Sequence, residues 1–451
     1  MEERADFRRR LIRLILPITF QQIMLGLVSA SDALMLGALT QDALSAVSLA
    51  GQVSFVENMF LAALTTGLSI LAAQYWGKGD RGAVERVFAY AMKLTAVLSA
   101  VFFLAGLLVP RGLMSIFTGE EPLIERGAVY LRTVSPAFLL TGLSQIYQTA
   151  LRNSGRPGIA SAVSCTSVVV NILLNALLIF GLWGFPRLEI VGAALATVLA
   201  RALEAVWCVA ETARPDRVKL RWRHLAHDDR LLRRDFWRYT WPVMGNQIVW
   251  GVGFTMYSVI MGHLGTDAVA ANSIANIVKN LLSSLCFGLG LGGGILVGNE
   301  LGAGRLERAR EYGGRLCHLA LACGAASAAA LLAAAPVILA VTDLSGQAAH
   351  YLKWMLVMCT YNMVGQSMNV MTFNGIFPAG GDSRFGFLCD SIVMWGYSVP
   401  MGCVAAFVLK LPVLAVFFII NLDEMVKLPA VYRHYKKYRW VKDLTVREET
   451  V

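Results

Sequence analysis

The segment LIRLILPITFQQIMLGLVSASDALMLG, residues 11–37, is long and apolar and carries one acid, Asp32, near its far end. A helix needs roughly 20 apolar residues to cross the hydrocarbon core of a bilayer, and this segment exceeds that length. Matching residues recur 225 positions further on: Pro17 with Pro242, Gln22 with Gln247, and Gly37 with Gly262. The segment therefore predicts a membrane-spanning helix that belongs to an internal repeat.

The whole chain has the composition of a polytopic membrane protein. Of its 451 residues, 56% are hydrophobic and only 16% are charged, and a soluble protein of this size would carry more surface charge. Twelve segments are long and apolar enough to span: 11–38, 45–75, 84–109, 124–149, 158–182, 188–211, 237–262, 268–298, 308–341, 346–376, 384–408 and 412–432. The sequence predicts an all-α membrane protein with twelve transmembrane helices.

Basic residues fix the predicted orientation, because Lys and Arg collect in short cytoplasmic loops. With a cytoplasmic N-terminus, 30 of the 40 Lys and Arg residues fall in inside segments and only four fall outside. We therefore expect both termini to be cytoplasmic. We also expect the protein to lie in the cell inner (plasma) membrane. The net charge of +10 follows from this topology, so a nucleic-acid partner, which would need a basic face on a soluble domain, is not expected.

The repeat divides the chain into two six-helix pseudo-symmetric lobes. The predicted lobes are residues 1–211 and 237–451, joined by a basic cytoplasmic linker at 212–236. An even number of spans in each half predicts two bundles related by an axis along the membrane normal, as in rocking, alternating-access transporters. The sequence has no Walker A motif and no His, Asp or Glu cluster with ligand spacing. We expect no catalytic residue, metal or cofactor, and transport driven by an ion gradient.

Asp32 is the leading candidate for ion coupling. A charge at depth in a membrane is costly and usually faces an interior or a cavity, and helical rise places Asn171, Asn175 and Thr197 in the same outer half of the first lobe. Burial disfavours the charged carboxylate and a nearby cation favours it, so proton binding and cation binding would compete, which is antiport. The alternative is that these polar groups only cross-link helices, with hydrogen bonds worth about 0.6 kcal/mol each.

Other charged residues inside the spans have open interpretations. Glu57, near the middle of the second span, is either a second proton or cation site or a local pair. Arg201 and Glu204 are three residues apart on one predicted helix, and we expect them to neutralise each other. Asp390 lies near the start of its span, where snorkelling or capping explains it as well as function does.

These residues together resemble the multidrug and toxic compound extrusion (MATE) family over nearly the whole chain. In the first lobe the likeness rests on Pro17 and Asp32, the turn AAQYWGKGD, the stretch from Ala150 to Gly155, Asn171 and Asn175, and GAALAT around Thr197. In the second lobe it rests on VGNELGAG, Pro378-Ala-Gly-Gly-Asp, Trp395 and Pro400. Each motif alone is weak evidence for the family, but their occurrence in this order along the chain is specific.

The resemblance implies an exporter of cationic or amphipathic organic compounds, driven by inward flow of H+ or Na+, with the acid at the Asp32 position as a cation or proton site. This chain departs from the family at Asn175, where some bacterial members have an acid, and in the second lobe, where Gln247 and Gln366 stand in place of acids used by another branch. Four residues are expected at the substrate cavity: Gln22, Gln247, Trp250 and Gln366. We expect a monomer in the lipid bilayer.

Three other classes of membrane protein share features with this chain. A major facilitator protein shares twelve spans but carries a different loop after its second helix, where this chain has Trp76-Gly-Lys-Gly-Asp80. A flippase or exporter of a lipid-linked precursor or metabolite, with the same superfamily fold, commonly has extra helices or a strongly cationic cavity. A membrane enzyme is the third alternative.

Overall fold

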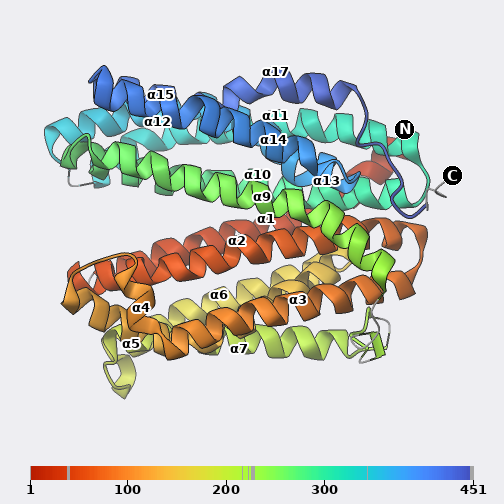
Figure 1. Cartoon of the computed structure of the whole chain (residues 1–451), viewed down its shortest axis with the longest axis horizontal. Helices are drawn as coiled ribbons and strands as arrows, with labels where there is room; N and C mark the ends of the chain where they lie inside the picture. Colours follow the sequence, from red (N-terminus) through yellow and green to blue (C-terminus); the bar gives the residue numbers. More distant parts are fainter. Residues whose placement is uncertain are drawn as a thin grey trace. The chain divides into compact units, whose positions relative to one another are not determined.

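The computed structural model of this chain is built from helices (Figure 1). It describes residues 2–37, 41–215, 217–221, 223–224, 229–342 and 344–446. A few side chains within helices lie outside this description, and that of Asp32 is one of them. Every regular element in the described residues is helical, which confirms the all-α fold.

The chain forms two compact units. The N-terminal unit comprises Met24–Ala72 and Asp80–Phe236, and the C-terminal unit comprises Met1–Ile23, Ala73–Gly79 and Trp237–Val451. The long helices α1 (Glu2–Gly37) and α2 (Gln41–Lys78) contribute residues to both units. The predicted lobe boundaries at residues 211 and 237 stay a prediction.

In the N-terminal unit, α3 packs against α5, and α7 packs against both α5 and α6. The elements after α2 are α3 (Arg81–Leu108), α4 (Pro110–Ser115), α5 (Glu121–Asn153), α6 (Pro157–Phe180), the short η1 (Leu182–Gly184) and α7 (Glu189–Thr212). Gly181 ends α6 in the left-handed conformation, with φ of 70°, which a glycine adopts without steric cost.

In the C-terminal unit, α12 packs against α10, α11 and α17. Its long helices are α9 (Arg230–Gly262), α10 (Thr266–Gly302), α11 (Leu306–Val341) and α12 (Gly346–Val370). The later spans are π-helical in part: η2 (Met371–Ile376) and α13 (Phe377–Ala379) continue α12, and α14 (Ser383–Val393) is followed by η3 (Met394–Ser398), α15 (Val399–Cys403) and η4 (Val404–Val408). The last elements are α16 (Val413–Ile420) and α17 (Asp423–Lys436).

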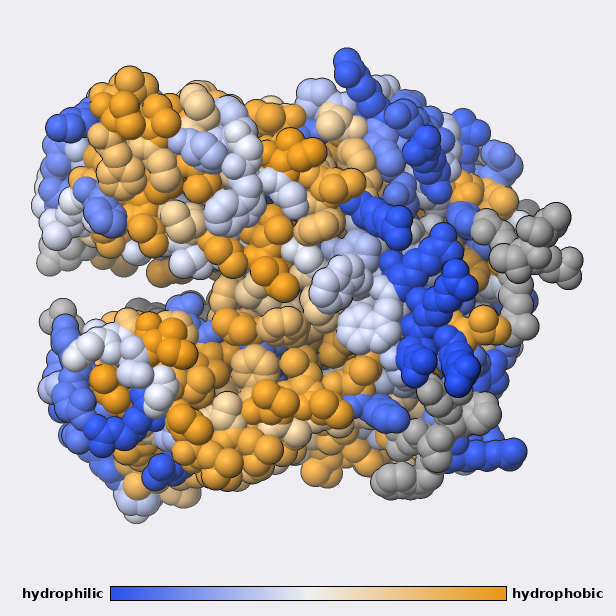
Figure 2. All heavy atoms as spheres, in the orientation of Figure 1, coloured by the Kyte–Doolittle hydropathy of each residue, from blue (hydrophilic) through white to orange (hydrophobic). Residues whose placement is uncertain are grey.

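Each of the twelve predicted spans coincides with a helical segment. By length and composition, eight helices within the described residues are apolar enough to cross a membrane. The other four segments are α5, α9, α12 with its continuation, and the pair α16 and α17. On the face drawn in Figure 2, apolar side chains cover much of the middle of each unit, while hydrophilic side chains gather toward the helix ends, as a bilayer requires.

The repeat is visible in matching turns. Gly79, with φ of 87°, ends α2, and Gly304, with φ of 73°, follows α10 at the equivalent position. Both are left-handed conformations that favour glycine. Asp80 then caps α3, because its side chain accepts a hydrogen bond from the backbone N–H of Ala83 at 2.9 Å.

The end of α2 is held inside the C-terminal unit. The Gln74 amide donates to the carbonyl oxygen of Ala379 at 2.6 Å and accepts from the backbone N–H of Leu444 at 2.6 Å. Glu300, fully buried at the end of α10, forms ion pairs with Arg10 at 2.9 Å and Arg305 at 2.6 Å. Through these contacts, segments near both ends of the chain bind the ends of α2 and α10 within the C-terminal unit.

Candidate functional site

In the N-terminal unit, Glu57 is a buried carboxylic group on α2, only 1% exposed. Ser99 on α3 donates a hydrogen bond to its Oε1 at 3.0 Å. Ser99 in turn packs against Gly142 of α5, where any side chain would overlap its hydroxyl. Glu57, predicted as either a second coupling site or a local pair, therefore has a hydroxyl partner on α3, and that hydroxyl packs against α5.

The predicted amide pair lies together on α6. Asn171 and Asn175 are both buried, and the Asn175 Nδ2 donates to the Asn171 Oδ1 at 3.3 Å. Their spacing of four residues puts them on one helix face, as predicted. Thr197, half-buried on α7, donates to the carbonyl oxygen of Ala193 in its own helix at 3.0 Å, a common arrangement for a helical threonine.

Asp32 lies within α1. Its side chain falls outside the described residues. Its role in coupling therefore stays a prediction from the sequence.

Arg201 and Glu204 form the expected ion pair on α7, with Arg201 Nη1 2.6 Å from Glu204 Oε2. The buried Glu204 carboxylate also accepts hydrogen bonds from the side chains of Gln148 on α5 and Ser167 on α6. Glu204 thus joins three helices, and its charge is matched by a permanent cation. This geometry is that of a structural cross-link.

The C-terminal unit contains a buried charged cluster that the sequence reasoning missed. It forms where the last predicted span breaks, since α16 ends at Ile420 and α17 begins at Asp423. Lys427 on α17, with a side chain only 2% exposed, lies with its Nζ 2.8 Å from Asp390 Oδ1, 3.2 Å from Glu424 Oε1 and 3.6 Å from Asp423 Oδ2. We call these four residues the Lys427 cluster.

Neutral side chains complete the surroundings of these carboxylates. Asn246 on α9 donates to Asp390 Oδ2 at 2.7 Å, and Asn369 on α12 donates to Glu424 Oε2 at 2.7 Å. The Tyr257 hydroxyl lies 3.4 Å from Asp423 Oδ2, at the long end of the range for a hydrogen bond. Four helices, α9, α12, α14 and α17, therefore converge on the Lys427 cluster.

A cavity of about 80 Å³ opens beside this cluster. Its lining combines amides, aromatic rings and charges: Asn246, Gln247, Trp250, Phe287, Gln366, Asn369, Val370, Phe373, Asn374, Asp390, Glu424 and Lys427. Three of the four residues predicted to line a substrate cavity, Gln247, Trp250 and Gln366, meet here. Gln22, half-buried on α1, is not in this lining.

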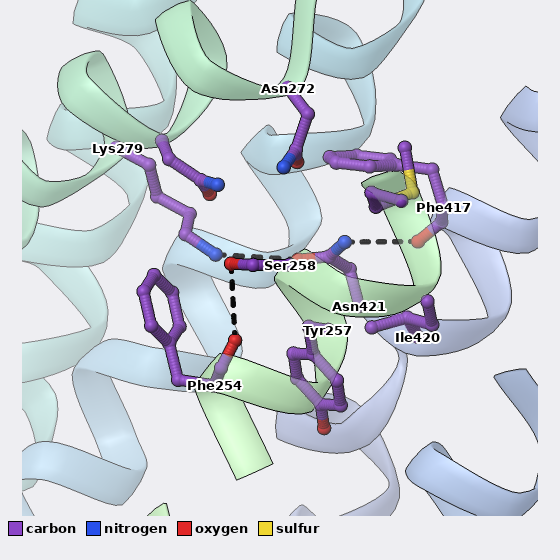
Figure 3. A pocket seen from close by; sticks show the side chains of 10 residues that line it. Phe254, Tyr257, Ser258, Asn272, Lys279, Phe417, Ile420 and Asn421 are labelled. Carbon is purple, nitrogen blue, oxygen red and sulfur yellow. Dashed lines mark hydrogen bonds between the residues drawn. The ribbon is translucent and has the colours of Figure 1, made fainter. Parts of the chain in front are cut away.

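A second, smaller cavity of about 20 Å³ lies near the same break (Figure 3). Lys279 on α10 points toward the side chain of Asn421 in the break, and its Nζ donates to the Asn421 Oδ1 at 3.3 Å. The Asn421 amide group donates to the carbonyl oxygen of Phe417. Tyr257 lines this cavity and also contacts Asp423, so the tyrosine connects it to the Lys427 cluster.

The missed cluster had a signal in the sequence. Asp423, Glu424 and Lys427 are three charges near the middle of the apolar segment 412–432, and the rule that singled out Asp32 and Glu57 applies to them equally. The sequence gives Asp390 two interpretations besides function, snorkelling and capping. The structure shows it paired with a buried lysine from another helix, an arrangement that neither snorkelling nor capping describes.

Comparison with known proteins identifies the family of this chain. The family model described as MatE matches residues 17–177 and 242–407, one match in each half of the chain. The chain belongs to the MATE family of transporters. A curated relative, "Probable multidrug resistance protein NorM" of Thermotoga maritima, is 28% identical over 68% of this chain and 66% of its own length. Another, "Uncharacterized transporter YisQ" of Bacillus subtilis, is 21% identical over 98% of this chain and 97% of its own length.

Solved structures of MATE transporters share the fold. The Vibrio cholerae MATE transporter VcmN in its bent form matches with a TM-score of 0.87 at 15% identity, over 99% of this chain and 100% of that one. A MOP superfamily transporter from Pyrococcus furiosus, described as having a binding pocket of reverse polarity, matches with a TM-score of 0.88 at 18% identity, over 96% of both chains. The twelve-helix arrangement is therefore that of a MATE transporter, a multi-pass membrane protein.

Proposed function

We propose that this MATE transporter is a secondary active multidrug efflux antiporter that exports cationic or amphipathic organic compounds in exchange for H+ or Na+ by alternating access. The observation that carries the proposal is the cavity beside the Lys427 cluster, where Trp250 and Phe373 line the same space as the carboxylates of Asp390 and Glu424. Rings and carboxylates are the groups that recognise an organic cation. Relatives named as probable multidrug resistance proteins agree with it.

Ion coupling is assigned to the N-terminal unit. Asp32 is the proposed site of proton or cation capture, with Asn171, Asn175 and Thr197 as its polar neighbours and Glu57 as an additional acid. The burial of Glu57, Asn171 and Asn175 supports this assignment, because buried polar groups in a membrane usually mark an ion or substrate pathway. Capture of an ion at Asp32 would then compete with cargo, and the protein would exchange one for the other.

The buried ammonium of Lys427 favours the other candidate, an exporter or flippase of a lipid-linked precursor or another anionic metabolite. Against it, the described groups nearest to Lys427 Nζ are three carboxylates. The cluster has more acids than bases, so its surplus charge attracts cations.

Dye efflux from cells tests the proposed function. Cells that produce the wild-type protein should extrude ethidium, and the Asp32→Asn variant should not, although it reaches the membrane in equal amount. Asp42→Asn is a matched control, because the Asp42 side chain is 62% exposed and its loss should leave efflux unchanged. Failure of the wild type to export any of a panel of organic cations, with export of a lipid-linked anion instead, would replace the proposal by its alternative.

A further inference from the structure

The Lys427 ammonium is shared between two helices. Its Nζ lies 2.8 Å from Asp390 on α14, and 3.2 and 3.6 Å from Glu424 and Asp423 on its own helix α17. A lysine ammonium has three N–H donors, so three carboxylates can use all of them. If Lys427 turned away from Asp390, two acids on α17 would still neutralise it.

The acids of the cluster outnumber the bases around them. Three carboxylates face the ammonium of Lys427 and that of Lys279, which bonds to Asn421 and also acts electrostatically on Asp423. Buried charges are stable only when they are paired and hydrogen-bonded. The surplus negative charge therefore has room for one more cation, and the cavity beside Asp390 and Glu424 is where a cation can enter.

An unused acceptor points to the same space. Asn369 is 3% exposed, and its amide group donates to Glu424. Its Oδ1 has no hydrogen-bond partner among the residues that the structure describes, although Asn369 lines the cavity. A buried acceptor without a donor is costly, so this oxygen is suited to a ligand that brings an N–H group.

The size of the cavity limits what can enter. About 80 Å³ is several times the ~10–15 Å³ that a cavity needs to hold one water molecule. An ammonium head group fits, and the rings of Trp250 and Phe373 in the same lining can cover the apolar body of the cargo. Aromatic faces attract a cation in addition to covering its apolar surface.

We propose that this cavity is the cargo ammonium site and that Lys427 is its resident competitor. The inference rests on the proposed export of organic cations and names their class: amines that carry N–H donors, in preference to quaternary ammonium compounds. In the empty site, Lys427 neutralises Asp390. An entering ammonium takes over Asp390 and donates to Asn369 Oδ1, and Lys427 stays with Asp423 and Glu424. Cargo binding thereby replaces the ion pair between α14 and α17.

Equilibrium binding to the purified full chain in detergent tests the amine preference without any gradient. The probes are benzylammonium and benzyltrimethylammonium, which share a ring and a charge but differ in N–H donors, and calorimetry measures their affinities. The wild type should bind benzylammonium about tenfold or more tightly than the quaternary probe. Asp390→Asn should remove that preference, and Asp267→Asn, at a half-buried residue that does not line the cavity, should keep it. Equal affinities in the wild type would overturn the inference.

A substitution of Lys427 tests its role as a competitor of the cargo ammonium. Lys427→Gln should bind benzylammonium about tenfold or more tightly than the wild type, because the internal cation is gone. If that variant is not monodisperse, Lys427→Gln with Asp423→Asn removes one charge of each sign and should show the same gain. Unchanged or weaker binding would make Lys427 a structural cation only. These measurements are independent of transport: gradient-driven efflux without amine preference refutes only this inference, and binding without efflux refutes only the proposed function.

Discussion

Gln74 and Asn299 occupy equivalent positions on α2 and α10, 225 residues apart in the sequence, and each has its backbone packed against a glycine of the other helix. Gly302 lies against the carbonyl group of Gln74, and Gly77 lies against that of Asn299. The two helix ends therefore cross with their backbones in contact, in a symmetric pair of contacts within the C-terminal unit. This relationship explains why glycines recur at this point of both repeats.

A side chain at the crossing should separate the two helix ends. At Gly302 the new Cβ of an alanine would overlap the Gln74 carbonyl oxygen, which is backbone and cannot rotate away. We expect Gly302→Ala to lower the free energy of unfolding by about 1–3 kcal/mol, the usual range for overpacking. Thermal unfolding in detergent measures it. Gly346→Ala, at a helix start with open space around it, is the control, and equal unfolding temperatures for the two variants would contradict the crossing.

The ion pair on α7 predicts unequal effects for its two partners. Arg201→Gln leaves the buried Glu204 carboxylate without a cation and should cost about 3 kcal/mol of stability. Glu204→Gln removes the charge but can still bond to Gln148 and Ser167, so it should cost less. Denaturant unfolding of both single variants and of the double variant measures the difference. If Glu204→Gln lost more stability than Arg201→Gln, the charge of Glu204 would have a role beyond cross-linking the helices.

Trp250 should contribute to cargo affinity through its ring. Trp250→Ala is expected to weaken binding of an aromatic cation by about 1–2 kcal/mol, roughly five- to thirtyfold in the dissociation constant. Trp241→Ala, on the same helix but 67% exposed, provides a matched tryptophan control. Calorimetric titration of both variants decides the point, and indistinguishable affinities would remove Trp250 from the cargo site.

Glu57 should matter for coupling without being needed for folding. Glu57→Gln preserves the shape of the side chain and an acceptor for Ser99, so the protein should remain folded and membrane-inserted. Ethidium efflux from cells should nevertheless fall to a small fraction of the wild-type rate, because an amide cannot take up a proton or neutralise a cation. Wild-type efflux by this variant would leave Glu57 with a local, structural pairing only.

Apolar length and the fixed repeat offset were sufficient to predict the helices. These signals are local, and each predicted span coincides with a helical segment. The break after Ile420 was not predicted, because the apolar run continues on both sides of it and only the charges of Asp423 and Glu424 interrupt the pattern.

The candidate site was predictable only in part. Spacing alone placed Asn171 beside Asn175 and Arg201 beside Glu204, since each pair lies on one helix. The pairing of Asp390 with Lys427 joins residues on different helices, and no periodicity in a single sequence reports such a contact. The free-energy cost of burying a charge in a membrane indicates that Asp423, Glu424 and Lys427 require partners. It does not identify the partner residues.

Transport in proteoliposomes, with proton and sodium gradients imposed separately, tests the central claim of ion-coupled export most directly. Purified wild-type protein should move ethidium against its gradient when one of the two ions flows in the opposite direction, and Asp32→Asn, reconstituted in equal amount, should not. Ethidium movement that ignores both gradients, or an Asp32→Asn variant as active as the wild type, would contradict coupling through this acid.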